Sequence, residues 1–236
     1  MRETEIARAR DELAARGWAV LSDAPFLPHG RPDPEGVLRI ATGFGRPSSR
    51  DGGREIWTVA PRTTRPGATF SMRAGGAAFH TDAQYHSRPE DVICLFVVRP
   101  AADGGDTMLL TARDVVATLR RDPAGETALE RLAQPVWTWT PPDVFSRKAA
   151  AAVPPMPVLP GDGTVRWRRD NLGPLCPPQA QAATVLESGL RRAPATRLSQ
   201  NPGDVIVIDN RRTLHGRTPF TDPERRLLRV RLWADR

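Results

Sequence analysis

The sequence predicts a mainly β protein with flanking helices, folded as a closed or nearly closed sandwich of strands. Seven consecutive apolar residues at 92–98 predict a strand that is buried on both faces. Short strand patterns separated by turns recur from there to the C-terminus, and helical patterns lie at the N-terminus and between the strand groups. The length of 236 residues fits one domain spanning residues 1–236.

The N-terminal part alternates helix and strand patterns. Residues 4–16 form an amphipathic helical pattern that ends at Gly17, and residues 34–42 form a second one, closed by Gly43. The strand patterns in this part are 18–21 and 55–59. The stretch 61–76 is rich in Arg, Thr, Pro and Gly and is expected to be a loop.

The rest of the chain continues the mixed pattern. The expected strands are 107–110, 164–168, 205–208, 213–218 and 225–233, and the expected helices are 112–121, 126–133 and 178–192. Residues 135–163 contain a strand-like stretch at 136–139 followed by many prolines, which restrict pairing to edges and turns. We therefore expect 135–163 to be an insertion or a lid over a site.

Composition limits the cellular setting. The charged N-terminal residues 1–16 contain no apolar stretch of the kind found in secretory signals, and no run is long and apolar enough to span a membrane. The cysteines, Cys94 and Cys176, are too few for a disulfide framework. These features predict a soluble, cytoplasmic protein.

The positive charge does not predict nucleic-acid binding. The formal net charge is +7 and the pI is about 10.9, but Lys148 is the only lysine and the arginines are scattered. No basic tail and no basic stripe interleaved with aromatic residues is present, so we expect no nucleic-acid partner.

The residues that carry chemistry are His80 and Asp82, separated by one residue. In an extended strand such side chains leave the same face, so both can reach one metal ion. His215, in the later strand pattern 213–218, offers a third ligand. Two histidines and one carboxylate on one face of an ion are typical of non-haem Fe(II) sites that activate O₂. The triplet alone is a weak signal, and a surface His and Asp is the alternative.

The last predicted strand suggests an anion site. By parity, one face carries Arg225, Leu227, Arg229 and Arg231, and the other carries Arg226 with three apolar residues. We expect the apolar face to point inward, which would bury Arg226, and a buried guanidinium needs an anion. Because Arg226 follows one turn after His215, it can hold the far carboxylate of a small diacid bound to the metal. A structural ion pair with Asp or Glu is the alternative.

Together these motifs resemble a known family. The motifs in order are His80-Thr81-Asp82, Gly104-Gly105-Asp106-Thr107, Asn201-Pro202-Gly203-Asp204, Asp209-Asn210, His215-Gly216-Arg217 and Arg226. The sequence from about 75 to 236 resembles the Fe(II)- and 2-oxoglutarate-dependent dioxygenases of the taurine dioxygenase and clavaminate synthase-like superfamily. The resemblance implies a double-stranded β-helix (jelly-roll) core. It places Fe(II) on His80, Asp82 and His215, and 2-oxoglutarate on Thr107 and Arg226.

The resemblance also implies a reaction, with O₂ as co-substrate. Many members of the clavaminate synthase-like branch oxidise free amino acids or their derivatives, so we expect hydroxylation of an unactivated C–H bond in such a small polar metabolite. Halogenating relatives lack the carboxylate ligand, and the presence of Asp82 therefore predicts that this enzyme is not a halogenase. Desaturation or cyclisation remains an alternative within the class. A non-catalytic β-barrel that binds a small molecule is the alternative of a different class.

Four further residues are weaker candidates for substrate binding. His86 shares the parity of His80 and Asp82 and is also a candidate for orienting the ligands. Arg217 shares the face of His215 if the strand is regular there. Arg168 and Asn171 follow the expected lid, and a solvated loop is the alternative for both.

Overall fold

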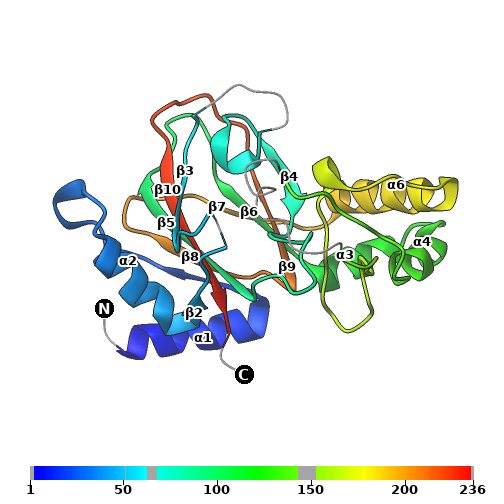
Figure 1. Cartoon of the computed structure of the whole chain (residues 1–236), viewed down its shortest axis with the longest axis horizontal. Coiled ribbons are helices and arrows are strands. Elements are labelled where there is room, and N and C mark those ends of the chain that lie inside the picture. The colour runs from blue at the N-terminus through cyan, green and yellow to red at the C-terminus, as the bar shows by residue number, and fades with distance from the viewer. Residues whose placement is uncertain (1–2, 51, 63–67, 143–152, 235–236) are drawn as a thin grey trace.

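The core of the protein is a pair of antiparallel β-sheets that face each other, with helices on both outer sides (Figure 1). The computed structural model describes residues 3–50, 52–62, 68–142 and 153–234. Its sheets form the double-stranded β-helix that the sequence led us to expect.

The larger sheet has six strands in the order β1-β8-β5-β10-β2, with β3 also pairing β10. The strands are β1 (Trp18–Leu21), β2 (Arg46–Pro47), β3 (Ile56–Val59), β5 (Val92–Arg99), β8 (Val205–Asp209) and β10 (Arg226–Trp233). The two long strands β5 and β10 lie side by side at its centre, with Leu95 opposite Arg229. This register places Arg229 in the middle of the sheet.

The smaller sheet has four strands in the order β4-β9-β6-β7. These strands are β4 (Ala77–His80), β6 (Thr107–Thr111), β7 (Thr196–Leu198) and β9 (Thr213–Arg217). His80, the last residue of β4, pairs with His215 on β9. The sheet therefore brings together two residues that are far apart in the chain.

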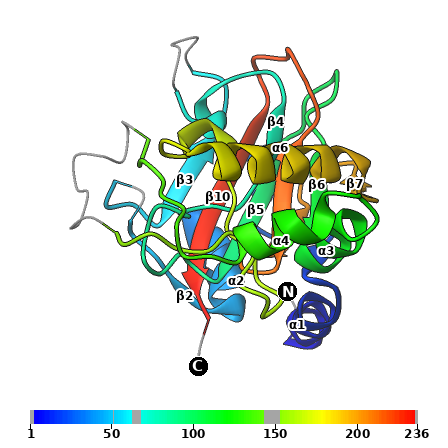
Figure 2. The same ribbon diagram turned by 90° about the vertical axis from the view of Figure 1, so that its right-hand side faces the viewer.

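Helices cover the outer face of each sheet. On the larger sheet, α1 (Glu3–Arg16) and α2 (Pro34–Ala41) pack over residues such as Phe96 and Val230. On the smaller sheet, α3 (Ala112–Leu119), α4 (Gly125–Leu132) and α6 (Pro177–Arg192) pack over Leu110 and Leu214 (Figure 2). Single 3₁₀ turns are η1 (Pro28–Gly30), η2 (Thr42–Phe44), η3 (Phe70–Met72) and η4 (Arg169–Asn171). The space between the sheets is filled by a third apolar cluster and by the site described below.

Local sequence explains the helix ends. The side chain of Asp33 accepts hydrogen bonds from the N–H groups of Glu35 and Gly36, which caps α2. Thr111 caps α3 in the same way through Asp114 N–H. Gly17, just after α1, has φ of +87°, a conformation that a side chain at this position would strain.

Most predicted elements are confirmed, and the exceptions are of two kinds. Residues 164–168 and 136–139 form no strand among the described residues, and Trp137 and Trp139 make only single bridges, to Met156 and Leu172. Alternation there reflects burial of the tryptophans against the helical layer. The short strands β2 and β7 were not expected, because their sequences carry no alternating pattern.

The expectation that Arg226 is buried is wrong. Arg226 is exposed, at a register shift where β10 begins, whereas Arg225 and Arg231 are buried. The alternation of residues along β10 separates its two faces correctly. The larger sheet is covered on both faces, however, and the sequence led us to expect the apolar face to be the one at the site. That face, with Leu228 and Val230, packs under α1 and α2 instead.

The predicted lid is only partly described. Residues 143–152 of the segment 135–163 lie outside the described residues. On either side of them, Trp137, Val158 and Leu159 are buried in the apolar cluster beneath α6. That the segment closes over a site stays a prediction. No helix within the described ranges combines the length and apolarity that crossing a membrane requires.

Candidate metal centre and active site

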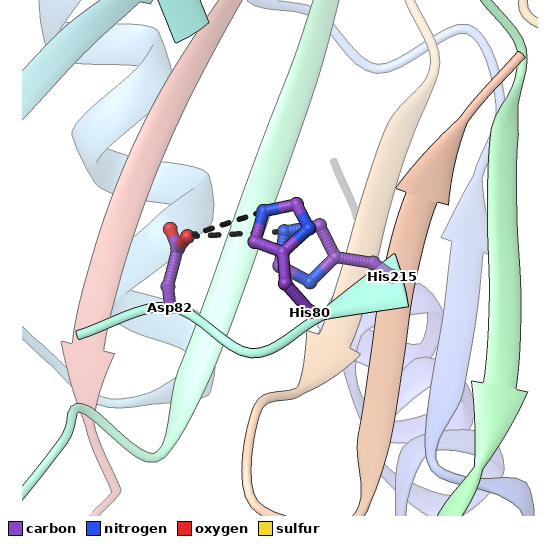
Figure 3. Close-up of side chains that lie close together, drawn as sticks. All are labelled: His80, Asp82 and His215. Carbon is purple, nitrogen blue, oxygen red and sulfur yellow. Dashed lines mark ion pairs between the residues drawn. The ribbon is translucent and has the colours of Figure 1, made fainter. Parts of the chain in front are cut away.

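Three side chains converge where β4 meets β9: His80, Asp82 and His215 (Figure 3). One potential ligand atom from each lies within 4.8 Å of the other two. Asp82 Oδ1 is 3.7 Å from His80 Nε2 and 3.9 Å from His215 Nε2. The three residues that the sequence singled out as metal ligands are therefore together in space.

Hydrogen bonding fixes the tautomer of His80 and directs its free lone pair toward the centre of the cluster. His80 Nδ1 lies 2.8 Å from the carbonyl oxygen of Ala78. Since a carbonyl only accepts, Nδ1 carries the proton and Nε2 is the unprotonated nitrogen. His215 Nδ1 is buried and has no hydrogen-bond partner among the described residues. Both rings thus face Asp82 through Nε2.

The protonation states suit a cation. Burial lowers the pKa of His80 well below its ordinary value, and the nearby His215 and Arg168 act in the same direction. Burial lowers the pKa of His215 to about 4. Burial would raise the pKa of Asp82, but Arg229 and the two histidines outweigh it and hold that pKa far below its ordinary value. At neutral pH the cluster is two neutral imidazoles and one carboxylate.

The second oxygen of Asp82 is bonded to Arg229. Arg229 Nη1 donates to Asp82 Oδ2 over 2.7 Å, and both side chains are buried. The carboxylate therefore directs Oδ1 toward the histidines and Oδ2 toward the guanidinium. Sequence reasoning placed Arg229 on an outward face, and this is the same error that misplaced Arg226.

A pocket extends from the histidines to a second buried arginine. It is lined by His80, His215, Thr107 and Arg225, among others. Arg225 Nη2 donates to the carbonyl of Gly105 over 2.9 Å, while Nε and Nη1 are buried without a partner among the described residues. The predicted contact Thr107 lines this pocket, but Arg226 does not.

The environment of Arg225 favours an anion. Burial, followed by the charge of Arg217, lowers the pKa of Arg225 to about 9. A carboxylate in the pocket would raise the pKa of Arg225 again, because it supplies a counter-charge and two hydrogen-bond acceptors. Thr107 Oγ1 accepts a hydrogen bond from Gln200 Nε2 over 2.7 Å, which leaves the hydroxyl proton free to donate to such a ligand.

Arg217 lines the pocket and bonds the neighbouring segment 70–75, which also contributes to the lining. Its guanidinium donates to the carbonyl oxygens of Gly75, Phe70 and Arg73 over 3.0–3.1 Å. Each of the three guanidinium nitrogens of Arg217 thus donates one hydrogen bond to the main chain of residues 70–75. Arg217 therefore holds this segment and also lines the pocket, and its role in substrate binding stays a prediction.

Arg168 lies close to the metal cluster. It is 5% exposed and binds both carboxylate oxygens of Asp170, over 2.7 and 3.0 Å. Its guanidinium lies 4.6 Å from the ring centre of Phe70, and that ring lies 5.1 Å from the ring of His80. Arg168 is thus not on a solvated loop, and its role in substrate binding stays a prediction.

The other two weaker candidates behave differently. Asn171 Oδ1 accepts a hydrogen bond from Gln84 Nε2 over 2.7 Å, which links η4 to the chain that follows Asp82. The His86 ring lies 4.6 Å from the ring of Tyr85 and is not part of the cluster of three ligands. Their roles toward a substrate stay predictions.

The site residues that the sequence did not reveal are Arg225, Arg229, Gln200 and Phe70. Arg225 lies immediately before β10 and Arg229 lies on it, and their spacing Arg-x-x-x-Arg, which shares one parity, was the available signal. Gln200 directly precedes the motif Asn201-Pro202-Gly203-Asp204, and Phe70 begins the 3₁₀ turn η3, but neither residue is itself part of a motif.

The residues present fit Fe(II) with 2-oxoglutarate. Two imidazoles and a carboxylate are the donor set of non-haem iron sites that keep positions open for other ligands. The unpaired nitrogens of Arg225 suit the distal carboxylate of a short dicarboxylic acid whose other end reaches the metal.

Comparisons with known proteins agree with this geometry. The family model described as "Taurine catabolism dioxygenase TauD, TfdA family" matches residues 2–143 and 130–231. An L-asparagine oxygenase of Streptomyces coelicolor is 30% identical over 195 residues, which is 78% of this chain and 56% of that protein. An L-lysine 3-hydroxylase of Catenulispora acidiphila is 30% identical over 155 residues, covering 60% of this chain and 40% of that protein. The chain thus spans about half the length of these two relatives.

Solved structures show the same fold. A structure of asparagine oxygenase with Fe(II), 2S,3S-3-hydroxyasparagine and succinate superposes with a TM-score of 0.77 at 21% identity, over 98% of this chain and 78% of that chain. The non-haem iron oxygenase OrfP with Fe and alpha-ketoglutaric acid gives 0.71 at 18% identity, over 100% of this chain and 81% of that chain. Because the family model covers most of the sequence, this chain belongs to the TauD/TfdA family of dioxygenases.

Proposed function

We propose that this protein is an Fe(II)- and 2-oxoglutarate-dependent oxygenase that hydroxylates a free amino acid or a closely related small polar metabolite. The observation that carries the proposal is a single pocket lined both by the two histidines of the candidate metal centre and by the buried Arg225. At one side lie His80 and His215 with Asp82, and at the other lies Arg225 with unpaired buried nitrogens. The family and the names of the relatives support the reaction class and the substrate class.

In this proposal each residue has a defined task. His80, Asp82 and His215 hold Fe(II), and Arg225 with Thr107 holds the distal carboxylate of 2-oxoglutarate in place of the Arg226 expected from the sequence. When bound, the metal and 2-oxoglutarate activate O₂, so that one oxygen atom enters the substrate while 2-oxoglutarate becomes succinate and CO₂. The His80 Nδ1 proton, donated to Ala78, fixes the tautomer that presents Nε2 to the metal.

The buried surroundings protect the reaction. Phe70 and Leu227 line the pocket and exclude water around the reacting groups. In this proposal Arg168, which is paired with Asp170 and lies over the ring of Phe70, orients an anionic part of the substrate. A cytoplasmic location belongs to the same proposal, supported by Cys94 and Cys176 both being free.

The experiment has two stages. Anaerobic protein mixed with Fe(II) and 2-oxoglutarate should develop a weak visible charge-transfer band, and His80→Ala or His215→Ala should abolish it. Addition of O₂ with a panel of free amino acids should then give succinate and a product 16 mass units heavier than one of them, the mass of the added oxygen atom. An unchanged band in both variants would exclude the metal assignment. Succinate without any heavier product across the panel would exclude the substrate class.

A further inference from the structure

Asp82 lies outside the regular sheet that positions the other two ligands. β4 ends at His80, which pairs with His215, and Asp82 belongs to the turn that follows. Ala83, the next residue, has φ of 58°, a conformation uncommon for a residue with a side chain. No strand ladder therefore holds the main chain of Asp82 where its carboxylate must face the histidines.

A single side chain replaces the missing ladder. Asn210 Oδ1 accepts a hydrogen bond from Asp82 N–H over 2.8 Å, and Asn210 Nδ2 donates to the Asp82 carbonyl over 3.0 Å. The amide of Asn210 thus bonds both main-chain polar groups of Asp82, as a neighbouring strand would. Asn210 Nδ2 also donates to the carbonyl of Glu90 over 2.8 Å.

Asn210 is itself firmly anchored. Its side chain is buried, with the residue 2% exposed, and its own N–H donates to the Asp91 carbonyl over 2.9 Å. It lies in the turn between β8 and β9, on the same stretch of chain that leads to His215. The side chain therefore joins the segment carrying His215 to the segment carrying Asp82.

From the other side, the preceding residue is held by main-chain contacts. Thr81 N–H donates to the Trp167 carbonyl over 2.8 Å, and Trp167 N–H donates to Thr81 Oγ1 over 3.1 Å. These bonds fix Thr81 but reach no polar group of Asp82. Asn210 is thus the side chain on which the placement of the Asp82 peptide depends.

We propose that Asn210 is a positioning residue for the metal centre, acting through the main chain of Asp82 and touching no ligand atom of the cluster. The inference rests on the proposed function, since it presupposes that Asp82 binds the metal. Without the amide, the buried N–H and carbonyl of Asp82 lose their partners and the turn relaxes around Ala83. Arg229 still holds Oδ2 of the carboxylate, but the main chain no longer holds Oδ1 in its position facing the histidines, and the ion is bound more weakly.

The test compares Asn210→Ala with Gln179→Ala. Gln179 is a matched control, because its buried amide also accepts from one main-chain N–H, that of Cys176, and donates to one carbonyl, that of Val136, each over 2.8 Å. It lies at the start of α6, in the helical layer outside the smaller sheet. The measurement is the Fe(II) dissociation constant of each anaerobic, metal-stripped protein, titrated with Fe(II) alone against a chelator.

We expect Asn210→Ala to weaken Fe(II) binding about 10- to 100-fold and Gln179→Ala to leave it unchanged. Asn210→Asp keeps the shape and the acceptor but loses both donated bonds. An added negative charge by itself would tighten cation binding, so weaker binding by this variant isolates the loss of positioning, and it decides the question if Asn210→Ala does not fold.

Two results would overturn the inference. One is Fe(II) affinity in the Asn210 variants equal to that of the unaltered protein. The other is an equal loss in Gln179→Ala, which would make the effect a general consequence of destabilisation. Failure of the unaltered protein to bind Fe(II) is a separate result, because it would overturn the proposed function and this inference with it.

Discussion

Asp82 divides its two carboxylate oxygens between Arg229 and the metal cluster: Arg229 Nη1 donates to Oδ2 over 2.7 Å, while Oδ1 faces both imidazoles. Because Oδ2 is already bonded to Arg229, Oδ1 is the oxygen that would be available to a cation held by the cluster. The same contact gives the carboxylate a counter-charge before any cation arrives.

The first prediction concerns this ion pair in the metal-free protein. Arg229→Gln should lower the free energy of unfolding by roughly 3–5 kcal/mol, because it leaves a buried carboxylate without its counter-charge. Arg226→Gln, at the exposed neighbouring position on β10, should change it by less than about 0.5 kcal/mol. Urea denaturation of the metal-stripped proteins measures both. Equal effects in the two variants would contradict the account of Asp82.

The second prediction concerns 2-oxoglutarate. Arg225→Ala should weaken binding of 2-oxoglutarate by about 2–5 kcal/mol, because the buried partner of its distal carboxylate is lost. Arg226→Ala should leave that affinity unchanged, since Arg226 is exposed. Titration of the anaerobic Fe(II) protein with 2-oxoglutarate, followed by the visible band, gives the dissociation constants. Sensitivity at Arg226 instead would restore the prediction made from the sequence.

The third prediction concerns Gly105, whose lack of a side chain leaves space for the Arg225 side chain. A Cβ atom at Gly105 would lie 2.7 Å from Arg225 Nε, and Gly105 has φ of +74°. Gly30 has the same φ but open space around it, so Gly30→Ala carries the same backbone strain without the contact. Gly105→Ala should raise the KM for 2-oxoglutarate at least tenfold, the effect of a loss of about 1.4 kcal/mol. A similar KM change in Gly30→Ala would assign the effect to strain alone.

The fourth prediction concerns acid. His215 has an ordinary pKa of 6.5 and a pKa of about 4 in the folded protein, so between these values the unfolded chain takes up a proton that the folded chain does not. The stability of the metal-free protein should therefore fall as pH decreases through this window, by about 3 kcal/mol for His215 alone. His80 acts in the same direction. Unfolding free energies from pH 7 to pH 4.5 should show a shallower dependence in His215→Gln, and an equal slope in both proteins would refute the neutral buried histidine.

The fifth prediction concerns halide. With Asp82 present, turnover in chloride or bromide should give a hydroxylated product and no halogenated one, because the carboxylate fills the ligand position and neutralises one charge of the cation. Mass spectrometry of the products decides. Asp82→Gly should be mostly inactive, since it also removes the group that Arg229 binds.

That His80, Asp82 and His215 lie together was predictable from their residue types and order, although the strand expected to carry both His80 and Asp82 ends at His80 and leaves Asp82 in the following turn. His80 and Asp82 are separated by one residue and so are close in the chain, and His215 was the remaining histidine in a strand pattern near the C-terminus. Arg225 was not predictable from parity, because alternation along β10 separates two faces without saying which one meets helices and which one meets the site. Only the covering of the larger sheet by α1 and α2 decides that.

Asn210 belongs to one of the motifs that carry the family resemblance, but its contact with Asp82 could not be predicted from the sequence, for another reason. Its partners are main-chain groups, which every residue has, so no complementary side chain marks the contact. The same holds for Gln200, whose bond to Thr107 depends on a turn bringing two distant segments together.

The three hydrogen bonds from Arg217 to the carbonyls of residues 70–75 have a mechanical consequence. Arg217 ends β9, the strand that carries His215, so the loop with Phe70 is fastened to the strand of a metal ligand. Phe70 and Arg217 both line the pocket, so these bonds tie one part of its lining to another. We therefore expect the segments that move to admit or release a substrate to be ones that Arg217 does not hold.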